Sequence, residues 1–401
     1  MAVTLPDAPW RRRPGLAELV ATLGAGEDGA RWVGGAVRDT LLGMPVADLD
    51  LATPLPPADV VRRLEAAGIK AVPTGIAHGT VTAVSHGSLV EVTTLRRDVS
   101  TDGRHAVVAF TDDWHEDAAR RDFTINALYA DPASGAITDY FGGLGDLAAH
   151  RVRFIGDPYR RIAEDHLRIL RFFRFHARFG SQVDAAGLAA CTARANDLMA
   201  LSRERIAAEL LKLLVAPGAV ATVALMIDHG ILRPVLPEIA DAARLAALAA
   251  AEADAGVAPD PIRHLAALLP REPAVGEAVA GRLKLPKAQR QRLILALTER
   301  GESPREDAYR HGSDAAVDRL LLTGGDPLPL AGWPIPRLPL TGGALVARGL
   351  DKGPFVARAL RQVEDQWIAE GFPAQPRVES IADAVVAEII SHAAAASSGR
   401  A

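Results

Sequence analysis

The stretch RWVGGAVRDTLLGMPVADLDL, residues 31–51, indicates how the N-terminal part of the chain folds. Residues 31–33 read as a short strand that runs directly into Gly34-Gly35. The residues after this glycine pair have helical spacing up to Leu41. In residues 48–51, aspartate and leucine then alternate with a period of two, which is typical of a strand. The stretch therefore predicts a strand, a glycine turn, a helix and a second strand.

The two aspartates of this stretch, Asp48 and Asp50, are candidate metal ligands. On a strand, residues two apart point to the same face with Cα atoms roughly 6.5 Å apart. Two carboxylates so placed can share divalent ions, and Mg²⁺ needs few carboxylates when substrate phosphates complete its ligands. Alone, such a pair more often represents two solvated acids on an edge strand, so the surrounding motifs decide between the readings.

Gly34 and Gly35 lie where a strand passes into a helix. A backbone without side chains lets N–H groups approach a phosphate closely, and a helix N-terminus favours an anion. Arg38 could add a charged donor to the same anion. A tight turn that needs no ligand would use the same glycines.

A more specific block follows at residues 120–127, with the sequence RRDFTINA. Its adjacent arginines, followed by an aspartate and an asparagine, can clamp phosphates and ribose hydroxyls. Phe123 and Ile125 should pack inward. A surface patch of ion pairs is the alternative interpretation.

Helical periodicity extends from Tyr159 to Phe179. Asp165 and Arg168 are three residues apart, so that one ligand can reach both. Aspartate accepts from an exocyclic amine and arginine donates to ring acceptors, so together they could read a base edge. An amphipathic helix held by salt bridges is the alternative. One helical face would carry the charged residues Glu164, Arg168, Arg171 and Arg178, and the opposite, buried face Ile169, Phe172 and Phe173.

These blocks resemble the class II nucleotidyltransferases, which comprise the tRNA CCA-adding enzymes and the bacterial poly(A) polymerases. The matching strings are GGAVRD with DLD, RRDFTINA, DPYRRIAEDHLR and SRERIAAEL, the last at residues 202–210. They occur in the family's order and cover roughly residues 30–215. The C-terminal half carries no further motif.

The resemblance implies an α+β fold in which a nucleotidyltransferase-type head, a mixed β-sheet with helices, is followed by an all-α neck, body and tail. The expected head spans residues 25–150, the neck with base recognition 151–215, and the body and tail 216–401, where tRNA would bind. The sequence agrees with this division, because a β-hairpin is expected around residues 86–88 and strand signals stop near Ile155.

The resemblance also implies a role for each candidate residue. Glu91, on the strand expected at residues 90–94, is a candidate third carboxylate near the metals. The loop at residues 97–105 resembles a flexible element that helps to switch the pocket from C to A. The other implied roles are binding Mg²⁺ (Asp48 and Asp50), contacting the triphosphate (Gly34, Gly35 and Arg38), holding ribose and phosphates (Arg120, Arg121, Asp122 and Asn126), neutralising phosphates (Arg171 and Arg174), and pairing with the base of CTP or ATP (Asp165 and Arg168).

Within this family we predict CCA addition to the tRNA 3′ end without a nucleic-acid template. Residues 75–82 look like the CCA-adding pattern, whereas poly(A) polymerases of this class carry a basic, aromatic string between the DLD and RRDFTINA blocks. Poly(A) synthesis and a narrower A-adding or CC-adding activity are the alternatives. A non-catalytic RNA-binding protein on the same scaffold is the rival from another class.

Composition sets further bounds. The 401 residues carry a net charge of −4, but residues 151–178 hold eight arginines against three acids, which suits local phosphate binding. The single cysteine, Cys191, excludes an internal disulfide. No histidine is followed by aspartate, and HExxH and Gly-Lys-Ser/Thr strings are missing, which argues against an HD-type phosphohydrolase, a zinc protease or a P-loop ATPase. We expect a cytoplasmic enzyme that binds tRNA, ATP and CTP, without a membrane span or DNA as a partner.

Overall fold

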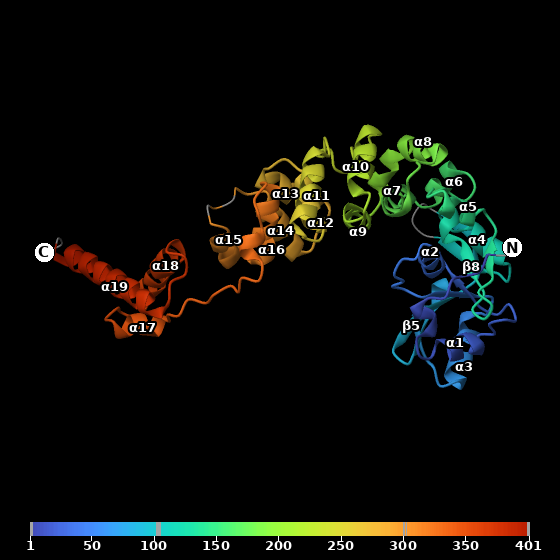
Figure 1. The fold of residues 1–401 in the computed structure, drawn as a ribbon, viewed down its shortest axis with the longest axis horizontal. Helices are drawn as coiled ribbons and strands as arrows, with labels where there is room; N and C mark the ends of the chain where they lie inside the picture. The colour runs from blue at the N-terminus through green and yellow to red at the C-terminus, as the bar shows by residue number, and fades with distance from the viewer. Residues whose placement is uncertain (1–2, 102–105, 300, 302, 399–401) are drawn as a thin grey trace. The chain divides into compact units, whose positions relative to one another are not determined.

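The computed structural model describes residues 3–101, 106–299, 301 and 303–398 (Figure 1). Contacts divide the chain into two compact units. The N-terminal unit comprises residues 1–242 and 281–285, and the C-terminal unit comprises residues 243–280 and 286–401. Each unit is described by itself below.

The described part of the N-terminal unit contains a seven-stranded sheet with the order β3-β4-β5-β2-β1-β8-β9. β2 runs parallel to β5, and all other neighbours are antiparallel, so the predicted mixed sheet is confirmed. The strands are β1 (Arg31–Val33), β2 (Asp50–Thr53), β3 (Lys70–Gly75), β4 (Thr80–Ser85), β5 (Ser88–Thr94), β8 (Leu128–Ala130) and β9 (Ile137–Asp139).

The predicted hairpin is formed by β4 and β5. Its turn consists of His86 and Gly87, with φ values of 48° and 82°. Two consecutive positive φ values define the turn type whose twist matches that of paired strands. Val81 and Ala83 of β4 face the core and are fully buried, whereas Thr82 and Val84 between and after them are only partly buried.

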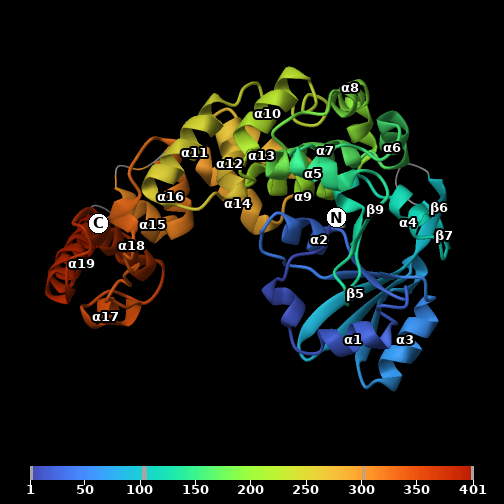
Figure 2. The ribbon, with the colours of Figure 1, turned by 45° about the vertical axis from the view of Figure 1, so that its right-hand side comes forward.

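Short helices surround the sheet, and α1 and α3 cover one face of it (Figure 2). α3 begins at Pro57, a residue that suits the first turn of a helix, and it buries Val60 and Leu64. The helices of this layer are α1 (Leu16–Thr22), α2 (Gly35–Leu41), α3 (Pro57–Ala66), α4 (Trp114–Ala119) and α5 (Gly143–Ala148), with 3₁₀ turns η1 (Pro9–Arg12), η2 (Ile76–His78) and η3 (Thr124–Asn126).

The strand predicted over residues 48–51 begins later than expected, at Asp50. Its pairing with β1 joins Trp32 to Leu51 and Arg31 to Ala52. Beyond that point β1 turns away at the glycines, so Asp48 precedes the ladder rather than belonging to it. The prediction of a strand at this place is thus correct, but the predicted start at Asp48 is two residues too early.

The loop predicted at residues 97–105 is also shorter than expected. β6 (Arg96–Thr101) pairs antiparallel with β7 (Ala106–Phe110) in a two-stranded ribbon. Backbone hydrogen bonds between the two strands satisfy main-chain groups that the polar composition had suggested were in a loop. The remaining part of the predicted loop, residues 102–105, lies outside the described residues.

Helices follow the sheet. The one predicted from Tyr159 to Phe179 is interrupted, because Asp165 adopts an extended conformation with φ −151° and ψ 107°. Its carboxylate accepts the N–H of Leu167 at 3.1 Å, a local bond that competes with continued helix. Ile169, Phe172 and Phe173 are fully buried as predicted. The helices are α6 (Pro158–Glu164), α7 (Arg168–Phe179), α8 (Ala185–Ala193), α9 (Arg203–Leu214) and α10 (Ala219–Asp228), with η4 (Ala195–Ala200).

The described part of the C-terminal unit is helical, as predicted, with an irregular segment around residues 326–339. The side chain of Trp367 is buried in a core to which the last three helices of this unit contribute. None of the helices in the described ranges is long and apolar enough to cross a membrane. The elements are α11 (Ala243–Ala255), α12 (Pro261–Leu268), α13 (Pro273–Arg282), α14 (Lys287–Ala296), α15 (Pro304–His311), α16 (Ser313–Leu322), η5 (Leu328–Leu330), α17 (Gly342–Ala347), α18 (Pro354–Ala369) and α19 (Gln375–Ser398).

Candidate active site

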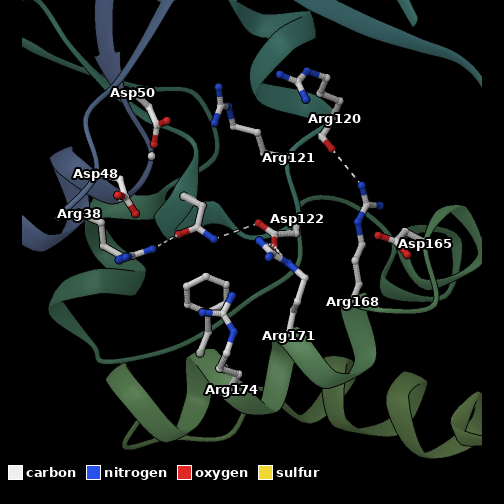
Figure 3. A pocket seen from close by; sticks show the side chains of 14 residues that line it. Arg38, Asp48, Asp50, Arg120, Arg121, Asp122, Asp165, Arg168, Arg171 and Arg174 are labelled. Carbon is white, nitrogen blue, oxygen red and sulfur yellow. Dashed lines mark hydrogen bonds and ion pairs between the residues drawn. The ribbon is translucent and has the colours of Figure 1, made fainter. Parts of the chain in front are cut away.

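One cavity of the N-terminal unit collects nearly all the residues that the sequence singled out (Figure 3). Its volume is about 540 Å³, and six arginines and four aspartates line it. Glu91 is the predicted site residue that is missing from its walls. The lining residues are Gly34, Gly35, Arg38, Asp48, Asp50, Arg120, Arg121, Asp122, Asn126, Asp165, Arg168, Arg171, Arg174 and Phe175.

The glycine turn presents backbone instead of side chains to this cavity. Gly34 has φ 68° and ψ −123°, a conformation that residues with a Cβ avoid. Its N–H donates to the carbonyl of Leu128 at 3.3 Å, which fixes the turn to β8. A Cβ on Gly34 would lie 3.6 Å from Nη1 of Arg121. Glycine therefore keeps the space between α2 and this arginine open.

Asp48 and Asp50 lie at one side of the cavity, away from Arg168 (Figure 3). Asp50 begins β2, and its register partner on the neighbouring strand β5 is Glu91. Burial raises the pKa of Asp50 to about 6, and the charges of Glu91 and Asp48 add to the effect while Arg121 opposes it. The carboxylates thus gather negative charge at this side of the cavity.

The two aspartates fit a hard divalent cation in their donor chemistry, since carboxylate oxygens are the ligands that Mg²⁺ prefers. Within the described residues no cluster of three His, Cys, Asp or Glu side chains is arranged to hold a metal ion. A cation at Asp48 and Asp50 would therefore need further oxygen ligands, which a bound triphosphate can supply.

Asp117 holds both arginines of the RRDFTINA block. Its carboxylate accepts from Nε of Arg120 at 2.8 Å, from Nη2 of Arg121 at 3.0 Å and from the hydroxyl of Tyr129 at 2.7 Å. Burial alone would raise the pKa of Asp117, but Arg121 and Arg120 hold it well below its usual range. Asp117 is 1% exposed. It therefore positions the two arginines and does not itself contact a ligand in the cavity.

Asp122 and Asn126 connect Arg38 of α2 to Arg171 of α7. Asp122 accepts from Nε of Arg171 at 2.7 Å and from the amide nitrogen of Asn126 at 3.0 Å. The amide oxygen of Asn126 accepts from Arg38. Burial lowers the pKa of Arg38, whereas Arg171 lowers that of Asp122 against the effect of burial. The network fixes where both guanidinium groups meet the cavity.

Aromatic packing sets the position of this network. Phe123 and Ile125 are buried, as predicted. The ring of Phe123 lies 4.9 Å from that of Phe154 and 5.4 Å from that of Phe175, between centroids. Because Phe123 is anchored in this way, the preceding Asp122 is held against α7.

Helix α9 supports α7 from the other side. Glu209, which is buried, accepts from Nε of Arg174 at 2.5 Å and lies 4.0 Å from Arg171. Both arginines also lie over the ring of Phe175, at 4.3 and 5.3 Å from its centroid. Carboxylate and ring together hold the two cations side by side at the cavity wall.

Arg168 uses part of its hydrogen-bonding capacity within the protein. Its Nη1 donates to Glu164 at 2.6 Å and to the carbonyl of Arg161 at 2.8 Å, and its Nη2 donates to the carbonyl of Arg120 at 3.2 Å. A guanidinium has five N–H donors. Among the described residues, these bonds leave the Nε–H and one Nη2–H of Arg168 for a ligand.

Asp165 lies beside Arg168 at the same end of the cavity (Figure 3). Both of its carboxylate oxygens lie 3.1–3.2 Å from Nη2 of Arg205 on α9. The partner orients the carboxylate but does not exhaust its lone pairs. Asp165 can therefore still accept a hydrogen bond from a ligand.

Three supporting side chains, Asp117, Arg205 and Glu209, were not identified from the sequence. Asp117 precedes Arg121 by four residues, and Arg205 precedes Glu209 by four within SRERIAAEL. Such spacing places side chains on one helical face. The spacing thus shows that Arg205 and Glu209 point the same way. It does not show their partners, Asp165 and Arg174, which lie elsewhere in the chain.

Two sequence families match parts of this chain. One, described as the poly A polymerase head domain, matches residues 30–153. The other, described as a probable RNA and SrmB-binding site of polymerase A, matches residues 182–243. The matches cover the sheet with its glycine turn and part of the helices that follow.

Individual proteins match over most of the chain. The mitochondrial CCA tRNA nucleotidyltransferase 1 of Mus musculus is 34% identical over 368 residues, which cover 85% of this chain and 83% of that protein. The CCA-adding enzyme of Lacticaseibacillus paracasei is 34% identical over 373 residues, covering 86% and 89%. The crystal structure of the Bacillus stearothermophilus CCA-adding enzyme in complex with CTP superimposes with a TM-score of 0.66 at 28% identity, covering 88% of this chain and 91% of that one.

These matches confirm the resemblance carried by the four sequence blocks and the α+β fold that it implied. The chain belongs to the family of CCA tRNA nucleotidyltransferases and poly(A) polymerases.

Proposed function

We propose that this chain adds CMP and AMP from CTP and ATP to the 3′ end of tRNA without a nucleic-acid template. The observation that carries the proposal is one cavity that holds Asp48 and Asp50 at one side and Asp165 with Arg168 at the other. The first pair suits phosphoryl transfer, and the second suits recognition of a base. Relatives of this chain are named as CCA-adding enzymes, and one was solved in complex with CTP.

The arginines of the cavity suit a nucleoside triphosphate. Partly buried guanidinium groups bind phosphate oxygens more strongly than exposed ones, because water screens them less. In this proposal the triphosphate meets the backbone of the glycine turn, while the network of Asp122 and Asn126 keeps the cations in place. The residues assigned to triphosphate and ribose are Gly34, Gly35, Arg38, Arg120, Arg121, Asp122, Asn126, Arg171 and Arg174.

The pair Asp165 and Arg168 can distinguish cytosine and adenine from guanine and uracil. Cytosine and adenine each carry an amine donor beside a ring nitrogen acceptor, which matches a carboxylate beside a guanidinium N–H. Guanine and uracil carry a carbonyl beside a ring N–H at the corresponding edge. They would place oxygen against the carboxylate and N–H against N–H, which leaves partly buried polar groups unpaired.

Enzymes of this family are nucleotidyltransferases, which generally use divalent metal ions. We assign Mg²⁺ to Asp48 and Asp50, with Glu91 as a third carboxylate on the adjacent strand. When bound, the cation would lower the pKa of the attacking hydroxyl and offset charge on the phosphates. The protein's own arginines would neutralise the remaining charge of the triphosphate.

The proposed reaction balances without another reactant. The 3′-oxygen of the RNA forms a bond to the α-phosphorus of the nucleotide, and the bond from that phosphorus to the β-phosphate oxygen breaks. Pyrophosphate leaves, and the proton of the hydroxyl passes to solvent. Each turnover lengthens the RNA by one nucleotide.

Incubation with a tRNA transcript that lacks its last three nucleotides, followed by sequencing of the products, tests the proposal. We expect C, C and A to be added in that order from CTP and ATP. Long adenosine tails would identify a poly(A) polymerase. Products that end after CC would identify a CC-adding enzyme, and extension only of tRNA that already ends in CC would identify an A-adding enzyme. Binding without extension would identify a non-catalytic RNA-binding protein. The double variant Asp48→Asn, Asp50→Asn should bind tRNA but add nothing.

We further propose the division into a head at residues 25–150, a neck at 151–215 and a body with tail at 216–401 that contacts tRNA. The match of residues 182–243 to a family described as an RNA-binding site supports RNA contact near the start of the helical part. A cytoplasmic location stays a prediction, since one relative is named as mitochondrial.

A further inference from the structure

Phe175 of α7 lies in the wall of the arginine-lined cavity, although its residue type suggests no part in binding a nucleotide. The other described residues of this wall are glycines, arginines, aspartates and an asparagine, so Phe175 is its one aromatic side chain. It is 5% exposed. A ring without hydrogen-bonding groups needs another physical reason to lie among so many charges.

The ring of Phe175 is surrounded by three guanidinium groups. Cζ of Arg174 lies 4.3 Å from its centroid, Cζ of Arg38 5.2 Å and Cζ of Arg171 5.3 Å. All three lie within the range of about 6 Å in which the negative face of a ring attracts a cation. Arg171 and Arg174 belong to α7 itself, whereas Arg38 comes from α2. Cations of two helices therefore meet at this ring.

Like charges held so close together repel each other. Burial lowers the pKa of Arg174, Glu209 opposes the effect, and the charge of Arg171 lowers the pKa further. A carboxylate relieves such repulsion, but it occupies N–H donors of the guanidinium when it accepts from them. The face of an aromatic ring attracts the cation through its quadrupole and leaves those donors free.

Arg174 shows the consequence for a ligand. Its Nε donates to Glu209. Within the parts of the chain that the structure describes, its Nη1 and Nη2 donate to no protein acceptor. Because Nε–H is only one of the five N–H groups of a guanidinium, most donors of Arg174 remain for the oxygens of an anion.

The ring of Phe175 is itself held in place. Its centroid lies 5.4 Å from that of Phe123, edge to face, and 5.9 Å from that of Phe179, nearly parallel. Cζ of Arg38 also lies 4.4 Å from the centroid of Phe179. Arg38 thus contacts two neighbouring rings of α7, which fixes the arginine of α2 relative to those of α7.

We propose that Phe175 is a positioning residue for the triphosphate: its ring holds three guanidinium groups together and leaves their remaining N–H groups to phosphate oxygens. The inference rests on the proposed binding of a nucleoside triphosphate in this cavity. The ring acts through the arginines and does not touch the reacting atoms. It should therefore affect the affinity for phosphates but not the choice of base, which is assigned to Asp165 and Arg168.

Two changes at this position in the full chain separate the charge distribution of the ring from its shape. Phe175→Leu removes the ring but stays apolar. Trifluorophenylalanine in place of Phe175 keeps a ring of nearly the same shape, whose fluorine atoms withdraw electrons from the face that attracts cations. We expect the Kd for inorganic triphosphate, measured by isothermal titration calorimetry, to rise about tenfold in Phe175→Leu and about threefold with the fluorinated ring. The ratio of kcat/KM for CTP to that for UTP should stay at the wild-type value in both.

Phe172 offers a matched control on the same helix. It is fully buried, its ring centroid lies 5.5 Å from that of Phe154, and no guanidinium group of the described residues lies over it. Phe172→Leu removes the same atoms from α7 and should lower the unfolding temperature at least as much. The Kd for inorganic triphosphate should nevertheless remain that of the wild type. Thermal unfolding of each variant shows whether it is folded.

The inference is overturned if Phe175→Leu binds inorganic triphosphate as tightly as the wild type. An equal loss of affinity in Phe172→Leu would also overturn it, because any ring of α7 would then have the same effect. A fluorinated ring with wild-type affinity would mean that the shape of the ring matters and not its charge distribution. A changed ratio for CTP and UTP would place the ring in base selection instead.

A separate measurement decides on the proposed function, namely whether the wild-type chain adds nucleotides to tRNA. If it adds none but its affinity for inorganic triphosphate depends on Phe175 as expected, only the proposed function fails. If the wild-type chain binds no inorganic triphosphate, both proposals are wrong.

Discussion

Among single residues, Arg168 has the contacts expected of a base reader, with part of its guanidinium bonded to the protein and two N–H groups left over. We predict that Arg168→Gln lowers the preference for CTP and ATP over GTP and UTP by about ten- to a hundredfold, since a bidentate contact to a base edge contributes about 1–3 kcal/mol of discrimination. The measurement is kcat/KM for each of the four nucleotides. Arg160→Gln is the control, because that side chain is 82% exposed and lies outside the cavity. Unchanged selectivity in Arg168→Gln would contradict the assignment.

Asp117 is a positioning residue in this structure, because it contacts both Arg120 and Arg121 but does not line the cavity. Asp117→Asn keeps its size but removes the charge that both guanidinium groups face. We expect the KM for CTP to rise and stability to fall by about 3–5 kcal/mol, the usual cost of breaking a buried ion pair from one side. Nucleotide kinetics and chemical denaturation measure the two effects. Asp112→Asn, at a nearby exposed position, should change neither, and an unaltered KM in Asp117→Asn would show that its arginines do not touch the nucleotide.

At the scale of elements, local patterns predicted what local chemistry determines. The glycines after β1, the hairpin turn at His86 and the apolar face of α7 all follow from residues close in sequence. The late start of β2 depends on what that segment meets in the fold, and the break at Asp165 comes from a side-chain bond that helical periodicity does not reveal. For the same reason the sequence revealed the arginines of the site but not Glu209, whose partner Arg174 lies on a different helix.

Helix α5 is tied to its surroundings by Asp146, which predicts a dependence on pH. Its buried carboxylate accepts from Thr124 at 2.6 Å and from Arg151 and Arg153 at 2.8 Å. Burial opposes the effect, but these hydrogen bonds lower the pKa of Asp146 below its usual value. A lowered pKa in the folded state adds stability above the unfolded value of about 3.9, and this stability is lost as the pH falls toward the folded pKa.

Asp146→Asn should therefore unfold at a lower temperature than the wild type at pH 7, and the difference should shrink as the pH falls below about 4. Thermal unfolding followed by circular dichroism between pH 3 and pH 7 measures the difference. Glu27→Gln, at an exposed position, should follow the wild-type curve throughout. A difference between Asp146→Asn and wild type that does not change with pH would mean that packing, not charge, explains the loss.

For the whole molecule, the sequence showed an excess of arginines at residues 151–178 but did not show which carboxylates pair with them. Arg151 and Arg153 pair with Asp146, and Arg171 pairs with Asp122. Each of these acids lies outside the basic segment. Net charge along a sequence thus predicts that anions can bind, whereas the fold decides which cations remain available for a ligand.

The division into two units predicts that nucleotide binding and the stability of the C-terminal unit can be changed separately. Every residue of the arginine-lined cavity belongs to the N-terminal unit. The C-terminal unit has its own buried ionic cluster, in which Nε of Arg263 lies 2.8 Å from Glu252 and 3.7 Å from Asp318. Arg263→Met would leave these carboxylates buried with fewer partners, at a cost of about 3–5 kcal/mol.

For Arg263→Met we expect a lower unfolding temperature for the C-terminal unit in calorimetry, with the Kd for CTP unchanged. Arg271→Met, at an exposed position, controls for the loss of a positive charge. A weakened affinity for CTP in Arg263→Met, but not in Arg271→Met, would contradict the prediction that the C-terminal unit and nucleotide binding can be changed separately.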